Sequence, residues 1–125
     1  MASREYDSFY KALQTKSIPS DLTIEEFRMR FEAWLMEFPA APEVQIESFK
    51  IGELAALWAF APDVTKRRII LFFHGGAYTA GSIDSHKNFV GRLSAAANAA
   101  VLAVQYRRAP EHPFPAALDD ALTAY

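Results

Sequence analysis

Five apolar residues, 69–73, run directly into the sequence His74-Gly75-Gly76. An unbroken run of Ile, Leu and Phe of this length predicts a buried strand. Glycine lets the backbone bend sharply and approach a ligand, so N–H groups can face a pocket instead of a neighbouring strand. Two interpretations stay open for these residues alone. They form a plain glycine-rich turn, or they place backbone donors where negative charge develops on a carbonyl oxygen.

A second segment, residues 101–120, starts as a strand and ends as a helix that opens after three prolines. Together with residues 74–78 it resembles the hormone-sensitive-lipase family of α/β-hydrolases. That family carries H-G-G-[GA] and, about thirty residues later, Y-R-x-A-P-E-x-P-[FY]-P-A-A-x-[DE]-D-A. The resemblance covers residues 69–125 and has two departures. Ala77 stands where many members have a third glycine, and Arg108 replaces the usual leucine.

The resemblance implies roles for five residues of the first motif. The backbone N–H groups of Gly76 and Ala77 are expected to face the oxyanion, while Gly75 and His74 support the turn. Tyr78 is expected either to line the substrate pocket or only to pack. The implied substrate is a small-molecule carboxylic ester. No pair or triple of His, Asp and Glu has metal-ligand spacing, so we expect no metal, and we expect no cofactor.

The nucleophile of this family is a serine in G-x-S-x-G, followed later by an acid and a histidine. No serine in this chain has glycine at both −2 and +2. His74, His86 and His112 all precede the position of the family's general base. We therefore expect a fragment of a serine carboxylic-ester hydrolase, esterase or lipase-like, that is inactive alone. The alternative is a non-catalytic small-ligand-binding or degenerate hydrolase-like module.

The pattern along the chain predicts an α/β fold. Two antiparallel strands, 44–51 and 54–60, are followed by strand–helix–strand–helix, which is the N-terminal half of an α/β-hydrolase sheet. We expect residues 1–40 to form cap-type helices. Residues 41–125 are then an incomplete α/β-hydrolase core that ends before the nucleophile elbow. The hydrophobic alternation of the first strand changes phase between Ile46 and Phe49, which predicts a bulge or burial on both faces.

Two amphipathic helices are predicted in the first 40 residues. Thr23 and Glu26 have the spacing of a capping box at the start of the second helix. Either the apolar stripes of these helices simply pack on the rest of the fold, or some of their aromatic residues touch substrate. The apolar residues at helical spacing are Tyr6, Phe9, Tyr10 and Leu13 in the first helix and Ile24, Phe27, Phe31, Leu35 and Phe38 in the second. The candidates for substrate contact are Tyr6, Phe9, Phe31 and Trp34.

Composition narrows the function classes. The net charge is −2 without a basic cluster, so we expect no nucleic-acid partner. The chain has no cysteine, which excludes disulfides and thiol catalysis. No stretch has the ~20 apolar residues of a membrane span, and we expect a cytoplasmic location.

Two further expectations concern the sheet edge and the proline-rich segment. The family places the strand at 69–73 between the strand at 101–105 and the nucleophile strand. Without the latter, this uncharged apolar strand becomes an edge that favours self-association. In the second motif, Arg107 is expected to pair with Glu111 or Asp119 and so to fix the proline-rich loop.

Overall fold

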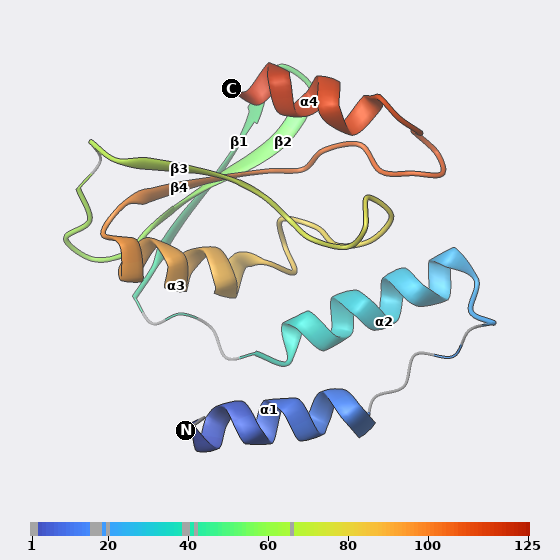
Figure 1. The fold of residues 1–125 in the computed structure, drawn as a ribbon. Helices are drawn as coiled ribbons and strands as arrows, with labels where there is room; N and C mark the ends of the chain where they lie inside the picture. Colours follow the sequence, from blue (N-terminus) through green and yellow to red (C-terminus); the bar gives the residue numbers. More distant parts are fainter. Residues whose placement is uncertain (1–2, 16–18, 20, 39–40, 42, 66) are drawn as a thin grey trace.

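The computed structural model describes residues 3–15, 19, 21–38, 41, 43–65 and 67–125 (Figure 1). Within these residues it has four helices and four strands. In chain order they are α1 (Arg4–Thr15), α2 (Ile24–Met36), β1 (Gln45–Ile51), β2 (Leu54–Phe60), β3 (Ile69–Phe73), α3 (Lys87–Ala97), β4 (Ala100–Val104) and α4 (Ala116–Ala124).

The strands form one sheet in the order β1-β2-β4-β3. Strands β1 and β2 are antiparallel, β2 and β4 are antiparallel, and β3 and β4 are parallel. Helix α3 connects the two parallel strands and packs on β2 and β4, while α4 lies over the opposite face of the sheet (Figure 1). The predicted α/β architecture, a hairpin followed by strand–helix–strand–helix, is confirmed.

The first hairpin has an unbroken register from Gln45 opposite Phe60 to Ile51 opposite Leu54. The predicted bulge or two-sided burial of this strand is therefore wrong. Strand β1 is an edge strand and is mostly exposed. Its Phe49 is 37% exposed and stacks on its cross-strand neighbour Trp58, with ring centroids 6.2 Å apart. The change of phase in the sequence reflects this half-exposed aromatic pair, not an extra residue.

The hydrophobic core lies between the middle of the sheet and α3. Strand β4 is buried on both faces, as its near-continuous apolar sequence requires. The core cluster consists of Leu57, Ala59, Ile83, Val90, Val101 and Ala103. Small alanines on β2 and β4 let α3 pack closely on the sheet. This packing fixes the orientation of β3 and β4, and therefore the direction in which the loops after them leave the sheet.

Strand β3 pairs with β4, and no other described strand pairs with its second edge. Ile69 is 59% exposed and Phe73 is 38% exposed along that edge. The expected open, uncharged edge is therefore present in the described chain. Whether it drives self-association stays a prediction.

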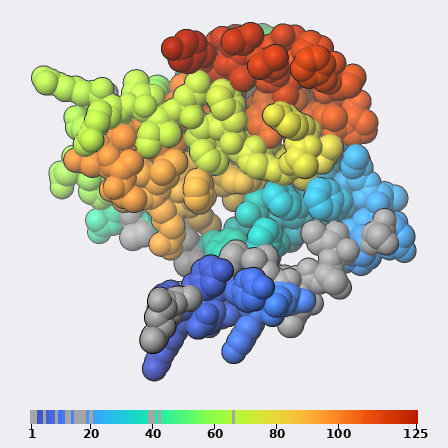
Figure 2. Space-filling model, viewed as in Figure 1, coloured from blue at the N-terminus to red at the C-terminus, as the bar shows by residue number. Residues whose placement is uncertain are grey.

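The two N-terminal helices lie away from the sheet, with α1 farthest from it (Figures 1 and 2). Helix α2 begins with the predicted capping box: Glu26 N–H donates to Thr23 Oγ1 at 3.3 Å, and Thr23 N–H donates to Glu26 Oε2 at 2.9 Å. On α1, Tyr6 and Tyr10 stack on each other and are about half exposed. The side chains of Phe9 and Leu13 lie outside the described residues. None of the described helices has the length and apolar character needed to cross a membrane.

Candidate active site

A strained turn follows the end of β3. His74 leaves the strand, and Gly76, Ala77 and Tyr78 then have φ values of +123°, +54° and +60°. A Cβ added to Gly76 would lie 2.1 Å from the carbonyl oxygen of Ala80. Only glycine fits at this position, because both the backbone angle and the space exclude a side chain. Two successive non-glycine residues with positive φ are uncommon and cost energy, and such strain gathers at functional sites.

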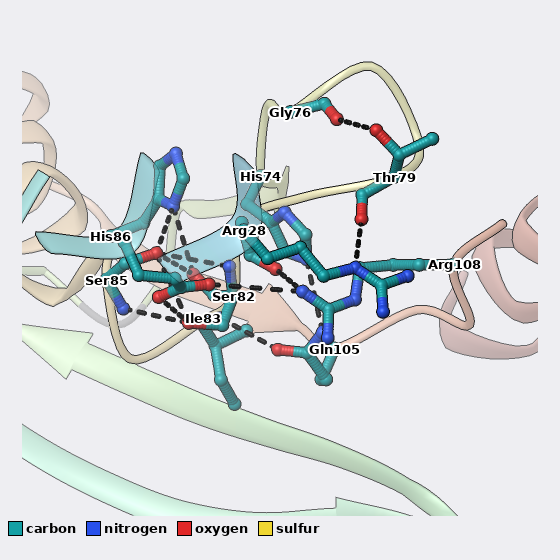
Figure 3. A network of polar contacts seen from close by, with 12 residues as sticks. Arg28, His74, Gly76, Thr79, Ser82, Ile83, Ser85, His86, Gln105 and Arg108 are labelled. Atoms are coloured by element: carbon teal, nitrogen blue, oxygen red, sulfur yellow. Dashed lines mark hydrogen bonds and ion pairs between the residues drawn. The ribbon is translucent and has the colours of Figure 1, made fainter. Parts of the chain in front are cut away.

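The hydrogen bonds of the turn leave the consecutive backbone N–H groups of residues 75–78 without an acceptor among the described residues. The carbonyl of Gly76 accepts from Thr79 N–H at 3.0 Å, Ala80 N–H at 2.8 Å and Thr79 Oγ1 at 3.2 Å (Figure 3). By contrast, no described residue accepts a hydrogen bond from the backbone N–H of Gly76 or Ala77. Backbone donors are normally paired, so consecutive unpaired donors in a tightly held turn are unusual.

His74 supports this turn from the protein interior. It is buried, and its Nδ1 lies 2.9 Å from the carbonyl oxygen of Gly75. Its ring stacks on Tyr106 with centroids 4.3 Å apart, and the Tyr106 hydroxyl donates to the His74 carbonyl at 2.6 Å. Burial lowers the pKa of His74, outweighing the opposite effect of its contact with Gly75. A neutral ring with a proton on Nδ1 then donates to Gly75 and holds the turn.

A cavity of about 720 Å³ lies between the turn and α4. Gly75, Ala77 and Tyr78 contribute to its wall, whereas Gly76 does not. Tyr78 is 68% exposed and meets the edge of Tyr106 with ring centroids 6.2 Å apart. The wall is mostly apolar, and its other members are Phe73, His74, Tyr106, Arg107, Ala109, His112, Phe114, Pro115, Ala117, Leu118 and Ala121. An apolar wall strengthens any hydrogen bond made to the turn.

The proline-rich loop after β4 is fixed by an ion pair, but not by the predicted one. Arg107 binds the buried carboxylate of Asp120 through its guanidinium, at 2.7 Å from Nη2, and through its backbone N–H at 2.7 Å. Burial alone raises the pKa of Asp120, but the hydrogen bonds from Arg107 outweigh it and hold the pKa below its ordinary value. The predicted partners are wrong because Asp119 faces solvent on α4 and Glu111 pairs with Arg28.

Comparison with known proteins identifies the family. A family model described as the alpha/beta hydrolase fold matches residues 70–125. An acetyl-hydrolase of Streptomyces hygroscopicus is 48% identical over 75 residues, and esterase LipI of Mycobacterium tuberculosis is 35% identical over 108 residues. A crystal structure of an esterase of the bacterial hormone-sensitive lipase family is 30% identical and superposes with a TM-score of 0.89 over 100% of this chain. The chain belongs to the hormone-sensitive-lipase-like family of α/β-hydrolases.

This hydrolase chain matches only part of the length of its relatives. It aligns over 60% of its own length with 25% of the acetyl-hydrolase, and over 81% with 33% of esterase LipI. A crystal structure of an esterase/lipase from an uncultured bacterium, 39% identical, has a TM-score of 0.89 over 99% of this chain and 42% of that protein. The fold of the described residues is therefore that of the corresponding part of a larger hydrolase.

The three histidines of the hydrolase chain do not converge on one centre. The rings of His74 and His86 lie 5.5 Å apart between centroids, and the Nδ1 of His86 contacts the carbonyl oxygen of Ser82 at 2.9 Å. His112 is exposed on the loop after β4. Among the described residues, no three His, Asp or Glu side chains gather in a way that could hold a metal ion.

Sequence reasoning missed the residues that hold the turn from outside. Tyr106 belongs to the second motif, but its position beneath His74 depends on the parallel pairing of β3 with β4. Arg108, the departure from the family pattern, has a partner: its guanidinium donates to the carbonyl of Gly81 and lies 3.9 Å from Glu32 of α2. The only sequence signal for such a contact was the opposite charge of distant residues, and charge alone does not specify a partner.

Proposed function

We propose that this chain supplies the oxyanion-stabilising part of a serine carboxylic-ester hydrolase. The observation that carries the proposal is the turn after β3, where the N–H groups of Gly76 and Ala77 lack any partner among the described residues. Ala77 and its neighbours Gly75 and Tyr78 line a largely apolar cavity of a size that suits a small ester. The esterase and acetyl-hydrolase relatives support the same reaction class.

The chemistry requires donors that are fixed before the reaction begins. When a serine oxygen attacks an ester carbonyl, the carbonyl oxygen gains negative charge in the tetrahedral intermediate. The N–H groups of Gly76 and Ala77 stabilise this charge, and the strained turn holds them without reorganisation. Loss of one such donor costs on the order of 3–4 kcal/mol of transition-state stabilisation.

The nucleophile, acid and base of the reaction come from outside this sequence. The chain has no G-x-S-x-G motif, so we expect no ester hydrolysis by residues 1–125 alone. The open edge of β3 and the neighbouring cavity are the natural place for a complementary polypeptide, and two copies can also associate there. Residues 1–40 contribute a cap over the cavity in this proposal, and a cytoplasmic location remains our prediction.

Reassembly tests the proposal. Residues 1–125 are co-expressed with the part of the uncultured-bacterium esterase that this chain does not match, and the purified complex is assayed with short-chain p-nitrophenyl esters. We expect hydrolysis by the complex and none by either part alone. A complex whose complementary chain carries alanine in place of its nucleophilic serine is the control and is expected to be inactive.

Two results would count against the proposal. If the two chains co-purify and bind ester analogues without hydrolysis, the chain is better described as a small-ligand-binding module. If Gly76→Ala leaves the reassembled activity at the level of Gly75→Ala, the turn does not stabilise the oxyanion. Binding without turnover would show as a change in the fluorescence of Trp34 or Trp58.

A further inference from the structure

Helix α2 carries two opposite charges on one face. Arg28 and Glu32 are four residues apart, which places them on the same side of the helix. Both side chains are largely buried, with 13% and 24% of their areas exposed. They reach two loops that are far away in the sequence, the loop after β3 and the loop after β4. Figure 3 shows Arg28 beside Thr79 of the first loop. Nothing in the oxyanion chemistry itself uses either residue.

Arg28 connects α2 to both loops through a single guanidinium group. Its Nε donates to the carbonyl of Thr79 at 2.7 Å, and its Nη2 donates to the carbonyl of Ala109 at 2.9 Å. Its two terminal nitrogens also bind the carboxylate of Glu111, each at 2.7 Å. This bidentate pair holds the pKa of Glu111 at about 2, so the carboxylate is charged at neutral pH.

Glu32 makes the second connection with the charges reversed. Its carboxylate accepts a hydrogen bond from Ser82 Oγ at 2.8 Å and lies 3.9 Å from the guanidinium of Arg108. Arg108 in turn donates to the carbonyl of Gly81. A positive and a negative charge on α2 therefore face a negative and a positive charge on the loop after β4. This arrangement fixes the position of the helix along its axis as well as its distance from the loops.

These contacts fix the peptide planes that follow the oxyanion turn. The carbonyls of Tyr78, Thr79 and Gly81 each accept from a donor outside the turn: the first from Ala109 N–H at 2.9 Å, the others from the two guanidinium groups. With its outer carbonyls held in this way, the segment cannot relax from its positive-φ conformation without breaking bonds. The conformation in which the N–H groups of Gly76 and Ala77 are unpaired among the described residues is thereby held in place.

We propose that Arg28 and Glu32 are positioning residues through which helix α2 sets the conformation of the oxyanion turn. The catalytic consequence rests on the proposed function, whereas the conformational one does not. The position of helix α2 and the conformation of the oxyanion turn are then coupled, because displacement of α2 removes the Arg28 guanidinium from the Thr79 carbonyl.

Residue-resolved hydrogen–deuterium exchange on residues 1–125, at low protein concentration, tests the inference without catalysis. The informative amides are those of Thr79, Ala80 and Ala109, whose acceptors lie within the turn. We expect Arg28→Gln to accelerate their exchange about tenfold or more while the amides of β4 stay protected. Arg30→Gln is the matched control, because Arg30 is an exposed arginine on the same helix.

The outcomes separate positioning from general stabilisation. Unchanged exchange at the three turn amides would overturn the proposal. Equal acceleration in the turn and throughout β4 would also overturn it, because Arg28 would then only stabilise the fold. Arg28→Lys should give an intermediate effect, since an ammonium group cannot reproduce the forked contacts of a guanidinium. Glu32→Gln should act mainly on the segment at residues 81–82.

A second readout addresses catalysis in the reassembled hydrolase. We expect Arg28→Gln to lower kcat about tenfold with little change in KM, since it misplaces donors that act in the transition state. A raised KM with unchanged kcat would overturn the catalytic part of the inference. An inactive wild-type complex would refute the proposed function instead, and the exchange experiment would still decide whether α2 positions the turn.

Discussion

The loops that follow β3 and β4 leave the sheet side by side at the carboxyl ends of two parallel strands, yet they have opposite compositions. Residues 74–81 contain three glycines, and their backbone runs through several positive φ values. Residues 105–115 contain three prolines and two arginines that form ion pairs. The first loop leaves consecutive backbone N–H groups unpaired among the described residues, while the second supports it with side chains and restricted backbone angles.

This difference shows that the two neighbouring loops have different roles: the first has unpaired backbone donors, and the second stabilises the first. A loop whose backbone donors are unpaired is not stabilised by its own hydrogen bonds alone, so residues outside the loop must stabilise it. The loop after β4 supplies these contacts through Tyr106, Arg108 and Ala109. Mutations in the first loop should therefore disrupt a backbone conformation that no other residue can restore. Mutations in the second loop should mainly remove contacts that stabilise the first loop.

The largest expected effect is at Gly76, where the first loop depends on the absence of a side chain. Gly76→Ala forces a Cβ to within 2.1 Å of the Ala80 carbonyl oxygen at a φ of +123°. We expect a loss of roughly 3 kcal/mol or more in the free energy of unfolding. Gly75→Ala is the matched control, because its Cβ would meet nothing within 4 Å, and it should change stability by less than about 1 kcal/mol. Equal losses in chemical denaturation would contradict the account.

The ion pair of the second loop should give the next largest effect. Asp120→Asn removes the charge that binds Arg107 in a site where the Asp120 side chain is only 5% exposed. Because Arg107 is itself 46% exposed, we expect a loss of roughly 2 kcal/mol, below the range for fully buried pairs. Asp119→Asn changes an exposed neighbour and should stay within about 0.5 kcal/mol. Denaturation curves that coincide for the two variants would show that the pair does not stabilise the loop.

A smaller effect is expected where the two loops meet. Tyr106→Phe removes the hydroxyl that donates to the His74 carbonyl at 2.6 Å but keeps the ring stack. The carbonyl loses its buried donor, so we expect a loss of about 1 kcal/mol. Tyr125→Phe, at a residue that is 99% exposed, serves as the control and should have no measurable effect. A neutral Tyr106→Phe would mean that the ring, and not the hydroxyl, joins the loops.

The smallest effect is a dependence of stability on pH through His74. Burial lowers its pKa, so the unfolded chain takes up a proton near pH 6.5 before the folded chain does. The stability linked to His74 is therefore fully present above about pH 6.5 and decreases as the pH falls below it. His74→Gln should flatten the dependence between pH 7.5 and 5. The measurement is the denaturation midpoint across that range.

Much of the fold was predictable because it follows from local patterns. The Thr23 capping box and the strand before His74 are signals within a few residues, and the structure has both. The strand at Gln45–Ile51 misled the prediction because hydrophobic phase was taken to report burial, and most residues of this edge strand are exposed.

The support of the site was less predictable because it depends on contacts between distant segments. The motif identified the turn, but nothing local indicates that Arg28 reaches Thr79, 51 residues away. Arg107 was expected to pair with Glu111 or Asp119 and instead binds Asp120, since α4 buries the Asp120 carboxylate and leaves Asp119 exposed. Opposite charges can be counted in a sequence, but their pairing is decided by the packing of helices on the sheet.

The most direct test of the central claim removes one backbone donor and keeps every side chain. Replacement of Ala77 by lactic acid exchanges its N–H for an ester oxygen and keeps the side chain, and the reassembled hydrolase is then assayed with short-chain esters. If the turn stabilises the oxyanion, kcat should fall about 10²–10³-fold while KM changes little. A kcat within about twofold of the unmodified complex would contradict the claim, because the donor that this structure leaves unpaired would then play no part in the reaction.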